Sequence, residues 1–193
     1  MSRLTYGVGF NSQRQHPTSK GGSTTKAYRT WRCMLQRCYD PKYQESKPTY
    51  VGCTVAEEWH DYQNFADWFY SNEYSDRGYE LDKDLLISGS KEYSPETCCF
   101  VPREINCLLH GNKAFRGEYP QGTHWHKASG KFACQIGING KLKHLGLFDC
   151  PNEAHEFYRK EKEIHIKNVA DLWFGSIDNR IYEILMDWEL PRE

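Results

Sequence analysis

The chain lacks several features that would place it in a familiar class. No apolar run of about 18 residues occurs among its 193 residues, so no transmembrane helix is expected. Its beginning has no apolar segment of the secretory type, which predicts a cytosolic location. Its eight cysteines include no Cys-x-x-Cys pair, and a cytosolic protein is not expected to form structural disulfides.

The cysteines allow two interpretations. A structural zinc site is conceivable from Cys38, Cys53 and Cys98, with Cys99 as a substitute for Cys98 and a fourth ligand required. The alternative is that these residues are buried free thiols, which pack as small apolar side chains.

Acidic residues are missing from the first part of the chain. Residues 1–39 contain seven Lys or Arg and no Asp or Glu. Residues 40–102 carry a net charge of −8, residues 103–148 of +5 and residues 149–193 of −5, although the whole chain carries only −1. Such segregation is expected when only part of a chain meets phosphates. Chance clustering with solvated acidic helices is the alternative.

Residues 122–158 contain the clearest structural pattern. Two short turns, at 128–130 and at Asn139-Gly140, separate three segments of strand length. Asn-Gly favours a hairpin because both turn residues adopt positive φ. Pro151 suits the first position of a following helix. The pattern predicts a three-stranded antiparallel sheet packed on one helix, with the other face of the sheet free.

Alternation along the second strand distinguishes the two faces of this sheet. The side that packs on the helix carries Phe132, Cys134, Ile136 and Ile138. The free side carries Ala133, Gln135 and Gly137. Basic and histidine side chains surround the free side: His124, His126, Lys127, Lys131, Lys141, Lys143 and His144. A ribbon of two or three strands fits the DNA major groove, which is about 12 Å wide. An ordinary solvated sheet face is the alternative.

This segment resembles the Apetala/ethylene-response-factor DNA-binding domain, which also occurs in phage integrases and homing endonucleases. The matching residues are Gly122, Gly130-Lys131-Phe132-Ala133, Gly140, Leu145-Gly146, Phe148 and Glu153-Ala154. In that family the free face reads bases and phosphates, which implies double-stranded DNA as the partner. The resemblance implies contacts from His124, His126, Gln135, Gly137, Leu142 and His144. The plant domain has arginines and tryptophans at several of these sites.

The whole sequence predicts an α+β protein, with N-terminal helices and a unit of two strands and a helix, then a three-stranded antiparallel sheet packed on a helix, and a C-terminal helix. Residues 1–25 are polar and basic, and predict a flexible arm in which Arg14 and Lys20 follow DNA. Apolar spacing predicts amphipathic helices near 25–39 and 57–70, whose tryptophans belong to the core. The expected parts after the arm are a ββα unit with N-terminal helices at 26–112, the sheet domain at 118–170 and a C-terminal helix at 171–193.

A candidate metal site lies within residues 79–106. Asp82 and Asp84 flank Lys83, and carboxylates two residues apart on a strand can reach one divalent cation. A helix after the second strand would bring Asn106 to the same place. Bound Mg²⁺ or Mn²⁺ would stabilise the charge that develops on the leaving oxygen in phosphodiester hydrolysis. An acidic turn neutralised by a lysine is the alternative.

The same unit is similar to phage-encoded HNH-type endonucleases. The similarity rests on Leu81-Asp82-Lys83-Asp84, Tyr93-Ser94-Pro95-Glu96-Thr97-Cys98, Ile105-Asn106, Trp31-x-x-Met34-Leu35-x-Arg37-Cys38 and Val55-x-x-Glu58-Trp59. It implies an endonuclease in the cytoplasm of a bacterial host, with Asp82 and Asn106 as metal ligands. The histidine base of such nucleases is replaced by Lys83. Lysine is a poor base at neutral pH unless its surroundings change it, so His60 and His110 are other candidates.

Three hypotheses about function follow. The first is a DNA-binding, HNH-like homing endonuclease in which Asp82 and Lys83 are catalytic and Lys83 acts as a base or phosphate contact. The second is a catalytically inactive, sequence-specific DNA-binding protein, such as a repressor, derived from such a nuclease. The third is a protein-interaction module that uses its acidic helices. The sequence does not indicate an oligomeric state.

Overall fold

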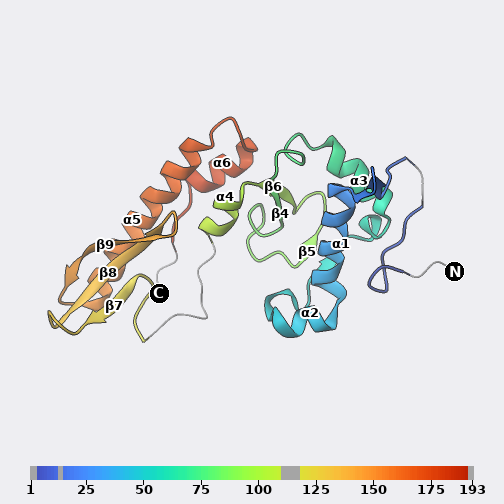
Figure 1. The fold of residues 1–193 in the computed structure, drawn as a ribbon. Coiled ribbons are helices and arrows are strands. Elements are labelled where there is room, and N and C mark those ends of the chain that lie inside the picture. Colours follow the sequence, from blue (N-terminus) through green and yellow to red (C-terminus); the bar gives the residue numbers. More distant parts are fainter. Residues whose placement is uncertain (1–3, 13–14, 110–117, 191–193) are drawn as a thin grey trace. The chain divides into compact units, whose positions relative to one another are not determined.

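The computed structural model describes residues 4–12, 15–109 and 118–190, and it has the α+β fold that the sequence predicts. The chain divides into two compact units, Met1–Asn106 and Cys107–Glu193. The C-terminal helix belongs to the second unit together with the sheet, where a separate segment was expected. In Figure 1 the first unit is blue to green and the second is yellow to red. Across the described ranges, no helix is both long and apolar enough to cross a membrane.

The framework of the first unit consists of three helices: α1 (Lys26–Tyr39), α2 (Pro41–Ser46) and α3 (Tyr62–Ser71). α1 begins where the Thr25 hydroxyl accepts a hydrogen bond from the Tyr28 N–H, and it ends at Asp40. The Asp40 carboxylate then accepts hydrogen bonds from the N–H groups of Lys42 and Tyr43. Asp40 therefore caps the end of α1 with its backbone N–H, which donates to the Gln36 carbonyl, and the start of α2 with its side chain.

Aromatic side chains fill the core of the first unit. Trp31, Met34 and Leu35 of α1 are at most 1% exposed, as their helical spacing predicts. The Trp31 indole N–H donates to the Trp59 carbonyl at 2.7 Å, and the Trp59 ring lies 5.1 Å from that of Phe65. These two tryptophans are core residues, as expected.

Six short strands complete the first unit: β1 (Ser19–Lys20), β2 (Ser23–Thr24), β3 (Thr54–Val55), β4 (Glu80–Asp82), β5 (Glu92–Tyr93) and β6 (Cys99–Val101). β1 and β2 form a hairpin, β3 pairs with β5 in parallel, and β4 pairs with β6 in antiparallel fashion. Helix α4 (Arg103–Leu108) follows β6 after one residue. The strand–loop–strand–helix unit predicted from residue 78 onward corresponds to β4, β6 and α4, but the loop contains an additional strand, β5, which pairs with β3.

The N-terminal segment is bound to the first unit, in contrast to the free arm expected for residues 1–25. The Gln63 side chain, only 1% exposed, is the main reason. Its Oε1 accepts the N–H groups of Gln15 at 3.0 Å and His16 at 2.8 Å, and its Nε2 donates to Asn11 Oδ1 at 2.7 Å. A buried amide needs partners for its polar atoms, and this segment supplies them.

The second unit consists of a three-stranded sheet packed on α5, and α6 packs on α5. Its elements are β7 (Thr123–His126), β8 (Lys131–Ile138), β9 (Lys141–Phe148), α5 (Pro151–Leu172) and α6 (Asn179–Met186). The strands are antiparallel in the predicted order β7–β8–β9. The β8–β9 turn has φ of 52° at Asn139 and 73° at Gly140, as a two-residue hairpin requires. The core between the sheet and α5 consists of Cys134, Ile136, Ala154 and Tyr158.

Gly122 fixes the contact between the start of β7 and α5. Its φ is +81°, and a Cβ built on it would lie 2.1 Å from the Tyr158 ring. Its carbonyl accepts the Gln135 N–H at 2.9 Å. Both the conformation and the closeness of the ring exclude a side chain at this position.

Candidate nucleic-acid interface and acidic turn

The register of the sheet shows which side chains share its free face. Residues directly opposite each other in an antiparallel pair lie on the same face. His124 is opposite Ala133, and Gln135 is opposite His144. Cys134, which lies between Ala133 and Gln135 on β8, belongs to the core against α5. His124, Gln135 and His144 therefore occupy the face that α5 does not cover, as the sequence predicts.

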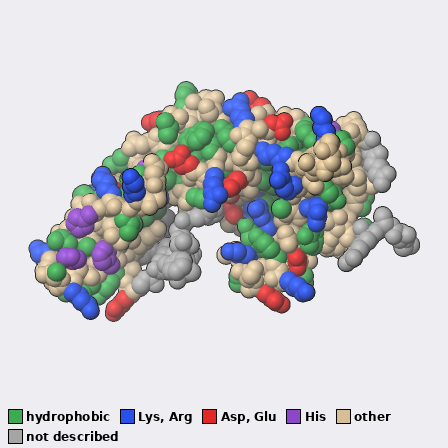
Figure 2. Space-filling model, viewed as in Figure 1, with side chains coloured by type: hydrophobic (Ala, Val, Ile, Leu, Met, Phe, Trp, Pro, Cys, Tyr) green, Lys and Arg blue, Asp and Glu red, His purple; other side chains and the backbone are tan. Residues whose placement is uncertain are grey.

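Further members of this face are defined by the same pairing. His126 is opposite Lys131, and Gly137 is opposite Leu142. Leu142 is 72% exposed, and Leu147, the partner of Ala133 on β9, is 41% exposed. In Figure 2, histidine, lysine and hydrophobic side chains lie interleaved where Figure 1 shows the sheet. The face combines imidazole and amide hydrogen-bonding groups with exposed apolar atoms.

A β-bulge explains why Leu147 joins His144 on this face. The register shifts between Cys134 and Gln135, whose partners are Gly146 and His144, so Leu145 has no opposite residue. Two residues three positions apart on a regular strand point to opposite faces, and the extra residue of a bulge removes that restriction. Sequence alternation identified His144 but missed Leu147, because no local pattern marks the bulge.

The sheet segment itself contains no acidic residue up to the end of β9. Residues 119–148 include four lysines and no Asp or Glu. Lys127 is exposed in the turn after β7, and Lys131 forms an exposed ion pair with Asp149 at 3.0 Å. An exposed pair of this kind contributes about 0.5 kcal/mol and is screened by salt, so it does not prevent Lys131 from meeting a phosphate.

Two of the lysines predicted to contact DNA do not belong to the free face of the sheet. Lys141 is opposite Ile138 and Lys143 is opposite Ile136, so both belong to the side of the sheet that faces α5. Both are exposed because they lie near the β8–β9 turn. Of the two basic residues predicted in the N-terminal segment, Lys20 is exposed in β1, whereas Arg14 lies outside the described residues.

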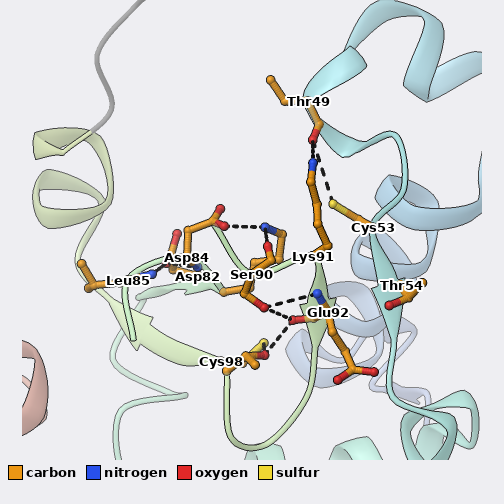
Figure 3. Close-up of polar contacts among 12 residues, drawn as sticks. Thr49, Cys53, Thr54, Asp82, Asp84, Leu85, Ser90, Lys91, Glu92 and Cys98 are labelled. Atoms are coloured by element: carbon orange, nitrogen blue, oxygen red, sulfur yellow. Dashed lines mark hydrogen bonds and ion pairs between the residues drawn. The ribbon is translucent and has the colours of Figure 1, made fainter. Parts of the chain in front are cut away.

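The Asp82 carboxylate organises the turn that follows β4. Its Oδ1 accepts the N–H of Asp84 at 2.9 Å and the N–H of Leu85 at 2.7 Å. This is the bonding of an aspartate that closes a turn on its own backbone. One oxygen of the first predicted metal ligand therefore has a local structural role (Figure 3).

Lys83 is buried, with 6% of its surface exposed. Its ammonium donates to Asp84 Oδ1 and to the Ser90 carbonyl, both at 2.6 Å, and lies 5.7 Å from the centre of the Tyr93 ring. Figure 3 shows the Asp84 carboxylate and Ser90 on this network. The geometry matches the alternative in which a lysine neutralises an acidic turn. The catalytic role of Lys83 stays a prediction.

Asn106 contacts a carboxylate that the sequence analysis did not single out. Its Nδ2 donates to Glu80 Oε2 at 2.7 Å, while its Oδ1 is buried without a hydrogen-bond partner. Glu80 lies two residues before Asp82 on β4, so the same spacing that marked Asp82 and Asp84 also applied to it. An unpartnered buried oxygen of this kind suits a metal ligand or an ordered water.

The three predicted magnesium or manganese ligands have three different sets of partners. Asn106 fits a cation through its free Oδ1, but Asp84 does not, because its carboxylate is neutralised by Lys83. Within the described residues, no three His, Cys, Asp or Glu side chains are grouped to hold a metal. Of the other candidate bases, His60 has its Nε2 3.5 Å from the Tyr39 hydroxyl, and His110 lies outside the described residues. The Mg²⁺ or Mn²⁺ site stays a prediction.

The predicted zinc ligands are buried thiols of the first unit. Cys38, Cys53 and Cys98 are at most 6% exposed. Burial, with Cys53 nearby, raises the pKa of the Cys38 thiol to about 12. Burial also raises the pKa of Cys98 to about 12. Zinc binds thiolates, so binding would have to overcome this preference for the protonated form. The zinc site also stays a prediction.

Cysteine alkylation should separate two classes of thiol. At pH 8 we expect a maleimide to modify Cys33, Cys107 and Cys150 quickly, because all three side chains are exposed to the reagent. Cys38 and Cys98 should remain unmodified, because burial raises the pKa of both thiols far above pH 8. Mass spectrometry should count three adducts on the native protein and eight after denaturation. Rapid native modification of Cys38 would contradict the buried arrangement.

The chain matches no protein-family model, no curated protein and no solved structure.

Proposed function

We propose that this protein binds double-stranded DNA through the free face of the β7–β8–β9 sheet. The observation that supports this most is the composition of the face and its rim. Imidazole, amide, lysine and exposed leucine side chains occur there, and the segment 119–148 has no carboxylate. A partner of high negative charge with both polar and apolar recognition groups suits this surface.

The chemistry of the face fits groove recognition. Gly137 leaves open space on the middle strand, where a side chain would otherwise project, and this space can accommodate a base edge. Gln135 and His144 supply hydrogen-bond donors and acceptors, which base edges in the major groove require. Leu142 can contact a thymine methyl group, while lysines around the face meet phosphates. Such a protein would act where genomic DNA is found, in the cytoplasm of a bacterial host.

A charge-matched pair of double variants tests this interface. Lys127→Gln/Lys131→Gln removes two charges beside the free face, whereas Lys160→Gln/Lys167→Gln removes two exposed charges on α5. In fluorescence anisotropy with duplex DNA, we expect the first variant to lose about tenfold in affinity and about one unit of salt slope per lysine. The second should bind like the unaltered protein.

The recognition role of the face needs a separate variant. Gln135→Ala/His144→Ala should reduce the preference for one duplex sequence over others while leaving the salt slope unchanged, because these groups carry no phosphate contact in the proposal. Equal losses in both lysine variants, or no affinity of the unaltered protein for any duplex, would refute the interface.

A second candidate function is metal-dependent cleavage of the bound DNA. The observation that favours it is the Asn106 Oδ1 atom, buried without a partner next to the Glu80 carboxylate in the β4–β6–α4 arrangement. Asp82→Asn tests it sharply, because asparagine keeps an acceptor for the Asp84 and Leu85 N–H groups while removing the charge. Cutting of native DNA with Mg²⁺ or Mn²⁺ that the variant and a chelator both abolish would support a nuclease. Binding without cutting favours the inactive DNA-binding protein.

A further inference from the structure

A groove with two arginines lies on the first unit, beside the exposed side of α1. It consists of two adjoining hollows that share Tyr6 and Arg32. The smaller hollow has a volume of about 270 Å³ and is lined by Tyr6, Thr24, Arg29, Arg32, Cys33 and Gln36. The larger one is open, about 700 Å³, and is lined by Leu4, Thr5, Tyr6, Gly7, Tyr28 and Arg32. Neither hollow involves the sheet or the acidic turn.

One wall of the groove is a tight turn held firmly against α1. The Val8 N–H donates to the Thr5 carbonyl at 3.3 Å, and the two central residues have positive φ, 52° at Tyr6 and 82° at Gly7. A bulky residue rarely adopts this conformation. Gly9 allows the chain after the turn to lie close to α1, since a Cβ there would lie 2.4 Å from Leu35 Cδ1. Tyr6 is thus kept at the groove although another residue would fit the turn more easily.

Helix α1 contributes two positive charges to the groove, and no ion pair among the described residues involves them. Arg29 and Arg32 are exposed and lie three residues apart, so they are neighbours on the helix surface. Among the described side chains, no carboxylate lies within ion-pair distance of either guanidinium. The first 39 residues contain no acid at all. None of the residues that line either hollow is acidic, so an anionic ligand in the groove would contact no carboxylate of its lining.

We propose that this groove is a second DNA contact, which binds the phosphate backbone through Arg29 and Arg32. Guanidinium groups match phosphate oxygens with paired hydrogen bonds, and Thr24 and Gln36 add neutral donors along the same groove. Phosphate contacts carry no sequence information, so this groove would contribute equally to the affinity for all duplex sequences. The proposal rests on DNA being the partner, but not on the sheet being its reader.

Matched variants of the first unit test the groove. Arg29→Gln/Arg32→Gln removes two charges inside it, and Lys42→Gln/Lys47→Gln removes two exposed charges at α2, outside it. With duplex DNA, the arginine variant should lose about one unit of salt slope for each arginine and should lose affinity equally for all sequences. The lysine variant should keep the slope of the unaltered protein.

Cys33 gives an independent reporter, because it is exposed and lines the smaller hollow. Bound DNA should slow its alkylation by a maleimide at least about tenfold when saturating, and the arginine variant should lose this protection while the sheet still binds. If the unaltered protein binds DNA with Cys33 unprotected and the arginine variant keeps its salt slope, the groove proposal is wrong and the sheet interface stands. If the unaltered protein binds no DNA, both proposals fail.

Discussion

Replacing Gly122 with alanine is expected to lower the free energy of unfolding of the second unit by about 3 kcal/mol. The alanine Cβ would lie 2.1 Å from the Tyr158 ring, and φ of +81° is unfavourable for any residue with a side chain. The strand β7 must move away from α5 or the ring must leave the core. Hydrogen exchange of the β8 amides, which reports on this unit alone, should become about a hundredfold faster.

Gly130→Ala is the matched control for this variant. Gly130 also has positive φ, +64°, but a Cβ there would have open space around it. Its replacement should therefore lower the free energy of unfolding by only about 1 kcal/mol, the backbone contribution alone. Similar exchange rates in the two variants would mean that Tyr158 does not press on Gly122. DNA binding through the sheet should weaken in the Gly122 variant in proportion to the unfolded fraction.

Lys83→Met is the second variant with a large expected effect. It leaves the Ser90 carbonyl and one oxygen of Asp84 without their donor in a region where the lysine was 6% exposed. We expect the free energy of unfolding of the first unit to fall by about 2 kcal/mol, because unpaired buried groups are costly and Asp84 is still partly hydrated. Denaturant unfolding, with hydrogen exchange of α1 amides, measures this loss.

Lys91→Met provides the comparison. The Lys91 ammonium is exposed and donates to the Thr49 carbonyl at 3.1 Å, as Figure 3 shows, so its loss should change stability by about 0.5 kcal/mol or less. The comparison of the two variants also separates a structural role of Lys83 from a catalytic role. A Lys83→Met protein with normal stability and no DNA cleavage would show that the amine takes part in the reaction.

The sheet of the second unit was predictable because its signals are local. Asn139-Gly140 can adopt the positive φ of a hairpin turn, and alternation in β8 separates Gln135 from Cys134 and Ile136. The apolar stripe of α1 was predictable for the same reason, since its spacing depends only on helical geometry. These elements need no knowledge of distant residues.

Long-range contacts explain what the sequence did not predict. Polar composition predicted a free N-terminal arm, but Gln63 binds that segment from 47 positions away. The spacing of Asp82 and Asp84 is the same for a metal site and for a turn. The structure adds the burial of Lys83, whose ammonium contacts the Ser90 carbonyl and lies near the Tyr93 ring, and the spacing of the two aspartates does not reveal this burial.

The bulge at Leu145 links the length of one turn to the surface that a partner meets. The two-residue turn pairs Ile138 with Lys141, while the far end of β9 pairs Phe132 with Phe148, and these two registers differ by one residue. A three-residue turn that included Lys141 would let β9 continue the register of its far end without a bulge. Gly137 would then be opposite Lys143, and Gln135 would be opposite Leu145. Lys143 and Leu145 would replace Leu142 and His144 on the free face, so the length of this turn decides whether an ammonium or an imidazole is presented there.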